Sequence, residues 1–209
     1  DGAEGGTGAG PHLATEETGI PLMAAIPEAR RALEDVGLAD DVDLVVAGGI
    51  RNGGDIAKCL ALGAKGVAIG TSALMALNCN KHLPGITDYE GTIGVPAGQC
   101  YHCHTGRCPV GIATQDVELR KRLDVDEAAL RVYNFLITLT MEVQLLARAC
   151  GKTNIHNLEP EDLAALTYEA SAMAKVPLAG TNYIPGVTEE NHLAEMRDMM
   201  AKMTGQGGN

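Results

Sequence analysis

Two short β-branched segments, each ending in glycine and each followed by a helical pattern, constrain the fold more than any other feature. Residues 43–47 end at Gly48-Gly49 and precede a helix predicted over residues 53–62. Residues 66–69 end at Gly70-Thr71, and Ser72 is placed to cap a helix over residues 73–77. This order with short loops is typical of a parallel α/β sheet or barrel. Because two strands cannot close a barrel, we expect further strands from an N-terminal region or from another chain.

Helical patterns are also predicted over residues 24–36, 126–149, 159–175 and 189–203, and a short helix over residues 115–123. Residues 80–102 form a polar insertion without periodicity. The helix over residues 126–149 is predicted to be amphipathic, with this set at helical spacing: Leu130, Tyr133, Asn134, Ile137, Met141, Leu145 and Ala149. In the last helix, a packing face is favoured over a cofactor site for these methionines: Met196, Met199, Met200 and Met203.

Charge and composition exclude some classes of partner. The net charge is −11 and no long basic stripe is present, which argues against nucleic acid. No apolar run is long enough for a membrane span, and no secretory signal is visible, so we expect a cytoplasmic protein. The sequence assigns no catalytic acid or base.

The glycines at the two strand ends are candidates for phosphate binding. Glycine lets backbone N–H groups approach an anion closely, and Gly48, Gly49, Gly70 and Thr71 follow strands one βα unit apart. The loops after the last two strands of a TIM barrel commonly hold phosphate. The alternative is that these glycines only form tight turns. The N-terminal loop with Gly5, Gly6 and Thr7 is expected on the same face, where it would contact flavin or substrate.

Four of the six cysteines are candidate metal ligands. Three lie within nine residues and Pro109 follows the last, while the fourth ends the helix after the second strand; they are Cys100, Cys103, Cys108 and Cys79. Cysteines close in sequence with a following proline are typical of iron–sulfur sites. A Cys₄ zinc site, in which His102 or His104 could replace a thiolate, and disulfides or inert thiols remain alternatives. Cys59 and Cys150 are predicted to pack on apolar helix faces.

These segments together resemble the FMN-binding domain of glutamate synthase over roughly residues 1–150. The strings that carry the resemblance are Gly5-Gly-Thr-Gly-Ala9, Gly48-Gly-Ile-Arg-Asn-Gly-Gly-Asp55, Leu62-Gly-Ala64, Ile69-Gly-Thr71, Leu74-Met-Ala-Leu-Asn-Cys79 and Cys103-His-Thr-Gly-Arg-Cys-Pro-Val-Gly-Ile-Ala-Thr-Gln115. The last string is the most specific. The glycine loops alone would also fit inosine-monophosphate dehydrogenases, but residues 1–12 lack the reactive cysteine of that class.

The resemblance implies a TIM barrel that holds FMN and a [3Fe-4S] cluster and forms glutamate from 2-oxoglutarate and ammonia. By position, Gly48, Gly49, Gly70 and Thr71 would bind the FMN phosphate. Cys79, Cys103 and Cys108 would ligate the cluster. The expected divisions are residues 1–78 for the C-terminal part of the barrel, residues 79–123 for the insertion and cluster segment, and residues 124–209 for C-terminal helices.

The sequence departs from the family's pattern at the cysteines. As many as 23 residues separate Cys79 from Cys103, where the family has a short spacing, and Cys100 is additional. Either Cys100 replaces Cys79, or four thiols hold a [4Fe-4S] cluster.

The tail resembles short stand-alone relatives, namely archaeal-type glutamate synthases and the barrel component of methylamine–glutamate N-methyltransferase (N-methylglutamate synthase), which makes N-methylglutamate. Methylamine is therefore an alternative substrate. A zinc-stabilised, non-catalytic barrel protein is a further alternative. We expect an oligomer with the missing N-terminal half of the barrel and amidotransferase-like or ferredoxin- or reductase-like subunits as partners.

Overall fold

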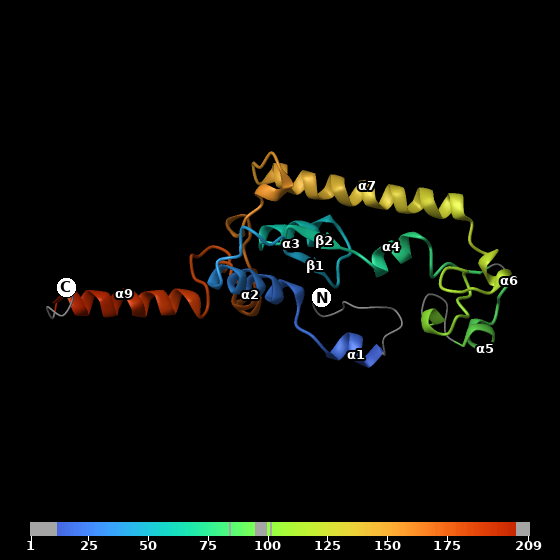
Figure 1. The fold of residues 1–209 in the computed structure, drawn as a ribbon, viewed down its shortest axis with the longest axis horizontal. Coiled ribbons are helices and arrows are strands. Elements are labelled where there is room, and N and C mark those ends of the chain that lie inside the picture. The colour runs from blue at the N-terminus through green and yellow to red at the C-terminus, as the bar shows by residue number, and fades with distance from the viewer. Residues whose placement is uncertain (1–11, 84, 95–99, 101, 204–209) are drawn as a thin grey trace.

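The computed structural model of the chain is built around one strand–helix–strand unit, and it describes residues 12–83, 85–94, 100 and 102–203 (Figure 1). Strands β1 (Val45–Ala47) and β2 (Gly66–Ala68) pair in parallel, and helix α3 (Gly53–Ala61) connects them. The predicted α/β class is therefore confirmed. Closure into a barrel stays a prediction, because the sheet formed by the described residues has two strands.

Local sequence fixes both ends of α3. At its start, the Asn52 side chain accepts a hydrogen bond of 2.9 Å from the backbone N–H of Asp55, which satisfies a donor that the first turn leaves free. At its end, Gly63 has a φ of 111°, a left-handed conformation that suits glycine. The N–H of Ala64 then donates to the Cys59 carbonyl, as in a Schellman turn. The predicted helix is thus confirmed to within one residue.

Helix α3 lies between the sheet and the long helix α7 (Val125–Ala149). On one side of α3, the fully buried Cys59 packs with Val46 of β1. On the other side, Leu60 packs with Val143 and Ala147 of α7. The molecule therefore has three layers, with two hydrophobic clusters separated by α3.

Helices α2 (Leu22–Asp35) and α8 (Tyr168–Ala174) close the cluster on the sheet side. Ile26 of α2 and Val176, just after α8, are buried in that cluster. Ser171 is fully buried, and its hydroxyl donates to the Val176 carbonyl at 2.7 Å. The helix predicted over residues 24–36 is confirmed, with a start two residues earlier.

The packing face predicted for α7 is wrong, although the helix itself is confirmed. Its buried residues are mostly small and lie on the opposite side from the expected stripe: Ala128, Leu139, Val143 and Ala147. The apolar residues of the expected stripe are between 44% and 65% exposed: Leu130, Tyr133, Ile137, Met141 and Leu145. Small side chains allow α7 to approach α3 closely, and side-chain size alone favoured the other face.

The single helix predicted over residues 159–175 is also wrong. A 3₁₀ turn, η3 (Pro160–Asp162), is separated from α8 by an extended stretch in which Ala165 forms a parallel bridge with Leu178. Thr167 then caps α8, since its hydroxyl accepts from the Ala170 N–H at 3.1 Å. Long-range pairing at Ala165 has overridden local helix propensity.

The insertion over residues 80–102 contains a short helix that periodicity did not reveal, α5 (Tyr89–Ile93). The Asp88 side chain caps it by accepting from the Gly91 N–H at 2.8 Å. The other short elements are α1 (His12–Glu17), α4 (Thr71–Ala76), α6 (Val117–Arg120), η1 (His102–His104) and η2 (Ile155–Asn157).

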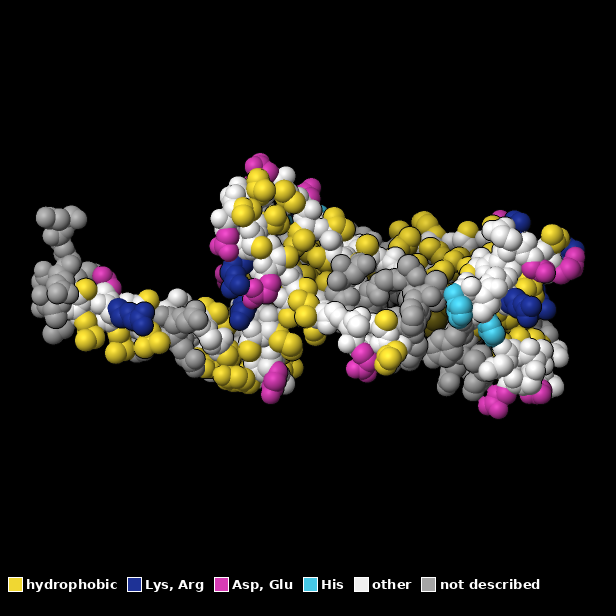
Figure 2. Space-filling model, turned by 60° about the horizontal axis from the view of Figure 1, so that its bottom comes forward, with side chains coloured by type: hydrophobic (Ala, Val, Ile, Leu, Met, Phe, Trp, Pro, Cys, Tyr) yellow, Lys and Arg dark blue, Asp and Glu magenta, His cyan; other side chains and the backbone are white. Residues whose placement is uncertain are grey.

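Helix α9 (Val187–Met203) extends away from the rest of the chain (Figure 1). Hydrophobic side chains line it at the left of Figure 2, and Met196 and Met200 are exposed. A buried packing face for these two methionines is therefore not seen among the described residues. Among the helices described, none is both long and apolar enough to span a membrane.

Candidate functional site

A pocket of about 360 Å³ opens where β1 ends. The backbone there takes left-handed φ values of 127° at Gly48 and 66° at Gly49, which would strain a residue with a side chain. The two glycines therefore turn the chain out of the strand and leave their backbone accessible to the pocket. The lining comes from the start of α2, this loop and α3: Pro21, Leu22, Met23, Gly48, Gly49, Ile50, Arg51, Asp55 and Lys58.

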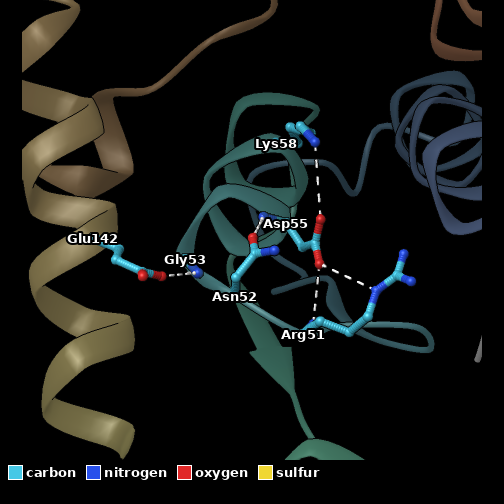
Figure 3. A network of polar contacts seen from close by, with 6 residues as sticks. All are labelled: Arg51, Asn52, Gly53, Asp55, Lys58 and Glu142. Carbon is cyan, nitrogen blue, oxygen red and sulfur yellow. Dashed lines mark hydrogen bonds and ion pairs between the residues drawn. The ribbon is translucent and has the colours of Figure 1, made fainter.

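Charged side chains on the α3 side of the pocket are linked through Asp55 (Figure 3). Its carboxylate accepts a hydrogen bond of 3.0 Å from the backbone N–H of Arg51. It also forms ion pairs with the Arg51 Nε at 3.9 Å and the Lys58 Nζ at 3.8 Å. Two cations and one carboxylate leave this wall with one net positive charge, which suits an anionic ligand.

The N-terminus of α3 is already occupied by the protein's own groups. Glu142 of α7 accepts a 2.6 Å hydrogen bond from the Gly53 N–H, and Asn52 accepts from Asp55 (Figure 3). The Glu142 carboxylate therefore takes the favourable position at the positive end of the helix dipole. An anion in the pocket would instead meet the Gly48-Gly49 backbone and the side chain of Arg51.

The second predicted phosphate loop, Gly70-Thr71, leaves the same edge of the sheet, because Ala47 and Ala68 are paired at the ends of the two strands. The structure does not bring this loop into the pocket lining. Gly70 is the N-cap of α4, so the cap predicted at Ser72 is wrong. The Ser72 Oγ is buried without a hydrogen-bond partner among the described residues. Burying an unpartnered hydroxyl is unfavourable, so Ser72 fits a site that receives a ligand oxygen.

The predicted cysteine ligands converge although 23 residues separate two of them. Cys79 follows α4 after a left-handed turn at Asn78, with a φ of 69°. It packs in one hydrophobic cluster with the buried Cys108, Leu83 and Val110. Cys100 is half-buried and Cys103, in η1, is exposed. All six cysteines of the chain are free thiols, so the disulfide alternative is not supported.

The electrostatics of these thiols show that they influence one another. Burial raises the pKa of Cys79, and the charges of Cys103, Cys108 and Cys100 raise it further. Burial also raises the pKa of Cys100, against a backbone hydrogen bond at His102 that lowers it, and Cys108 and Cys103 add to the rise. Mutual repulsion of this kind is relieved when a cation binds and deprotonates the thiols.

The donor set therefore fits a thiolate-bound metal or cluster in its chemistry. In the described part of the chain, no three Cys, His or acidic side chains are yet arranged to hold a metal ion. Of the histidines considered as ligands, His102 contacts the Ile93 carbonyl through its Nε2, and His104 is exposed. His102 is thus engaged by α5 and is a poorer candidate than the thiols.

The remaining predictions have mixed outcomes. Gly5, Gly6 and Thr7 lie outside the described residues. Cys59 is buried as predicted, and burial raises the pKa of its thiol to about 11, with a further rise from Asp55. Cys150 is exposed at the end of α7, so the packing predicted for it is wrong.

The charged wall of the pocket was not predicted from the sequence. The spacing of Asn52 and Asp55 is a helix-start signal, so the position of Asp55, and with it Arg51 and Lys58, was open to inference. Glu142 carried no such signal, because 89 residues separate it from its partner Gly53.

Known proteins of similar sequence agree with this site. Residues 1–153 match the family model described as the conserved region in glutamate synthase. A glutamate synthase large subunit-like protein of Rhizobium meliloti (strain 1021) is 52% identical over 186 residues, which cover 89% of this chain and 42% of the relative. An archaeal glutamate synthase [NADPH] of Methanocaldococcus jannaschii is 39% identical over 158 residues, which cover 76% of this chain and 28% of the relative.

An archaeal-type glutamate synthase [NADPH] of Dehalococcoides mccartyi is 37% identical over the same share of this chain. The chain thus spans less than half the length of these relatives. Since the family model covers well over half of the chain, and the cysteine and glycine segments lie within the match, the chain belongs to the glutamate synthase family.

Proposed function

We propose that this chain is part of a flavin- and iron–sulfur-dependent oxidoreductase that forms glutamate from 2-oxoglutarate and ammonia. The observation that carries the proposal is the convergence of four thiols from either side of the 80–102 insertion, next in the chain to a βα unit with a glycine-lined pocket. When bound, FMN would supply hydride chemistry and the cluster would supply single electrons.

Three features of the βα loops support binding of the FMN phosphate. The backbone of Gly48 and Gly49 lines the pocket, and Arg51 offers a cationic head beside them. The buried Oγ of Ser72 is a donor that needs an acceptor. Gly70 has open space around its Cα, so a ligand group could approach its backbone. The role of the chain here is to bind and orient the phosphate end of the flavin.

The cysteine segment would hold the cluster through Cys79, Cys103 and Cys108, with Cys100 as a fourth ligand. Three thiolates would suit [3Fe-4S] and four would suit [4Fe-4S]. The hydrophobic cluster around Cys79 and Cys108 would exclude water from part of the site, which lowers the dielectric around the sulfurs.

The architecture we propose is the C-terminal part of a TIM barrel in residues 1–78, followed by the cluster segment and helices. Further subunits of the amidotransferase, ferredoxin or reductase type would supply ammonia and electrons. A cytoplasmic location and an oligomeric state stay predictions from the sequence.

The first experiment measures cofactors in protein purified without oxygen. We expect FMN released on denaturation, together with iron and acid-labile sulfide. Zinc in place of iron would instead support the non-catalytic, zinc-stabilised alternative, and protein without flavin, iron or sulfide would overturn the proposal.

A second experiment separates the two candidate amine substrates. The assembled enzyme is supplied with 2-oxoglutarate and either ammonia or methylamine, and the amino acid formed is identified by mass spectrometry. We expect glutamate from ammonia, in line with the names of the relatives. Preferential formation of N-methylglutamate would assign the chain to the methylamine–glutamate N-methyltransferase type.

A further inference from the structure

The outward face of α7 is apolar and uncovered in the described structure. Its five large apolar residues, defined here as the α7 stripe, span about 22 Å at the rise of an α-helix: Leu130, Tyr133, Ile137, Met141 and Leu145. The opposite side of the helix is buried against α3. A helix that is apolar on both sides is normally covered on both. Contiguous apolar surface of this extent marks a contact site rather than ordinary exposure.

The position of α7 indicates what covers the stripe. α7 is the long helix that follows β2 in the chain, and it packs on α3, the helix that precedes β2. In parallel α/β folds the helices pack side by side over the sheet, each between two neighbours. β2 pairs with β1 on one side and with no described strand on the other. The next strand and helix of such a fold would therefore lie beside β2 and α7.

We propose that the α7 stripe and the free edge of β2 together bind further strand–helix units of a glutamate-synthase-family α/β domain. This inference rests on the barrel architecture proposed above and names the surface through which that architecture is completed. A free strand edge exposes unpaired backbone groups that proteins generally cover. Relatives are long enough to contain such units, since the chain spans only 42% and 28% of two of them.

The chemistry of the stripe favours an apolar partner of this kind. Only two charged residues lie between Leu130 and Leu145, and both already have partners within the chain. Arg131 pairs with Glu127 at 2.6 Å, and Glu142 accepts from Gly53. The stripe therefore offers packing surface rather than charge. A second copy related by a two-fold axis would bring the β2 edges together antiparallel, which would interrupt the parallel sheet.

The test mixes the 209-residue chain with the part of the Rhizobium meliloti relative that it does not match, made as a separate polypeptide. Complex formation is measured by titration and by light scattering after size-exclusion chromatography. We expect a 1:1 complex whose Kd rises about ten-fold or more in the double variant Leu130→Lys/Leu145→Lys. The matched control is Leu166→Lys, which changes an exposed leucine outside α7 and should leave the Kd unchanged.

Because both substituted leucines are exposed, the thermal midpoint of the isolated double variant should stay close to that of the wild type. If the separate part is insoluble, co-expression and capture through a tag on that part gives the same comparison. Equal binding by the wild type and the double variant, or no complex in either format, would overturn the inference. Self-association of the chain that the double variant abolishes would identify a second copy as the occupant instead. Flavin and iron are measured in parallel, so that docking without cofactors would count against the proposed function alone.

Discussion

The Glu142 carboxylate of α7 accepts a hydrogen bond of 2.6 Å from the backbone N–H of Gly53, the first residue of α3. The contact joins residues 89 positions apart and lies directly after the pocket loop of Gly48-Gly49. α7 begins after the cysteine segment, so this bond ties the helix that follows the candidate cluster site to the helix that follows the candidate phosphate loop.

Replacing Glu142 should destabilise the chain measurably. A partly buried hydrogen bond to a charged group contributes about 1.5–3 kcal/mol, and the carboxylate also faces the positive end of the α3 dipole. We expect Glu142→Ala to lower the free energy of unfolding by about 1–3 kcal/mol, and Glu142→Gln by less because the amide oxygen still accepts. Urea unfolding measures both. The bond would be shown to be unimportant if Glu142→Ala changed stability by less than about 0.5 kcal/mol.

The same contact makes Gly53 intolerant of a side chain. A Cβ at this position would lie 2.3 Å from the Glu142 Cβ and 2.9 Å from the Leu139 carbonyl oxygen, so α7 would have to move away from α3. We expect Gly53→Ala to cost about 1–3 kcal/mol. The neighbouring Gly54→Ala is the matched control, because its Cβ would meet only the Asn52 Oδ1 at 3.1 Å and alanine favours helix. Equal thermal midpoints for the two variants would contradict this account.

Local signals in the sequence predicted the elements of the fold well. The two strands, α3 and its glycine end, and the long α7 all followed from short-range patterns. What failed depended on long-range contacts. No local pattern indicated that Ala147 and Val143 of α7 would pack on α3 while Leu145 stays exposed, because that choice depends on how closely two helices approach.

The candidate site was predictable to a similar degree. Gly48 and Gly49 do line a pocket, and Cys79 joins Cys108, as their order in the sequence suggested. Ser72 is not a helix cap, since Gly70 is the residue that precedes the first turn of α4. Capping by Glu142 could not be foreseen, because nothing in the sequence places residues 53 and 142 in contact.

The buried thiol of Cys59 should make stability depend on alkaline pH. Burial raises the folded-state pKa from 9.0 to about 11, so below pH 9.0 the thiol is neutral in both states and its contribution is complete. Between 9.0 and about 11 the unfolded chain loses its proton first, and stability falls by up to about 2–3 kcal/mol. Urea unfolding of the wild type and Cys59→Ala across this window should show their difference shrinking or reversing. A difference that stays constant would refute the assignment, because the variant retains every other titrating group.

The cysteine segment allows the sharpest separation of ligand from bystander. If Cys79 and Cys108 anchor a cluster in their shared hydrophobic environment, Cys79→Ser should remove most of the iron per chain. Cys100→Ser should retain iron but change the cluster from a [4Fe-4S] to a [3Fe-4S] electron paramagnetic resonance signal if Cys100 is the fourth ligand. Cys150→Ser is the control, because that thiol is exposed at the end of α7 and is not among the charges that act on Cys79.

Three patterns of iron content distinguish the ligand sets. Loss in Cys79→Ser with an unchanged signal in Cys100→Ser would indicate a three-thiolate cluster without Cys100. Loss in Cys100→Ser with retention in Cys79→Ser would show that Cys100 replaces Cys79. In that case the raised pKa of Cys79 would reflect burial beside the site rather than ligation. Full iron in every single variant would contradict a cluster held by these thiols, since removing one anchoring thiolate should lower affinity for the metal.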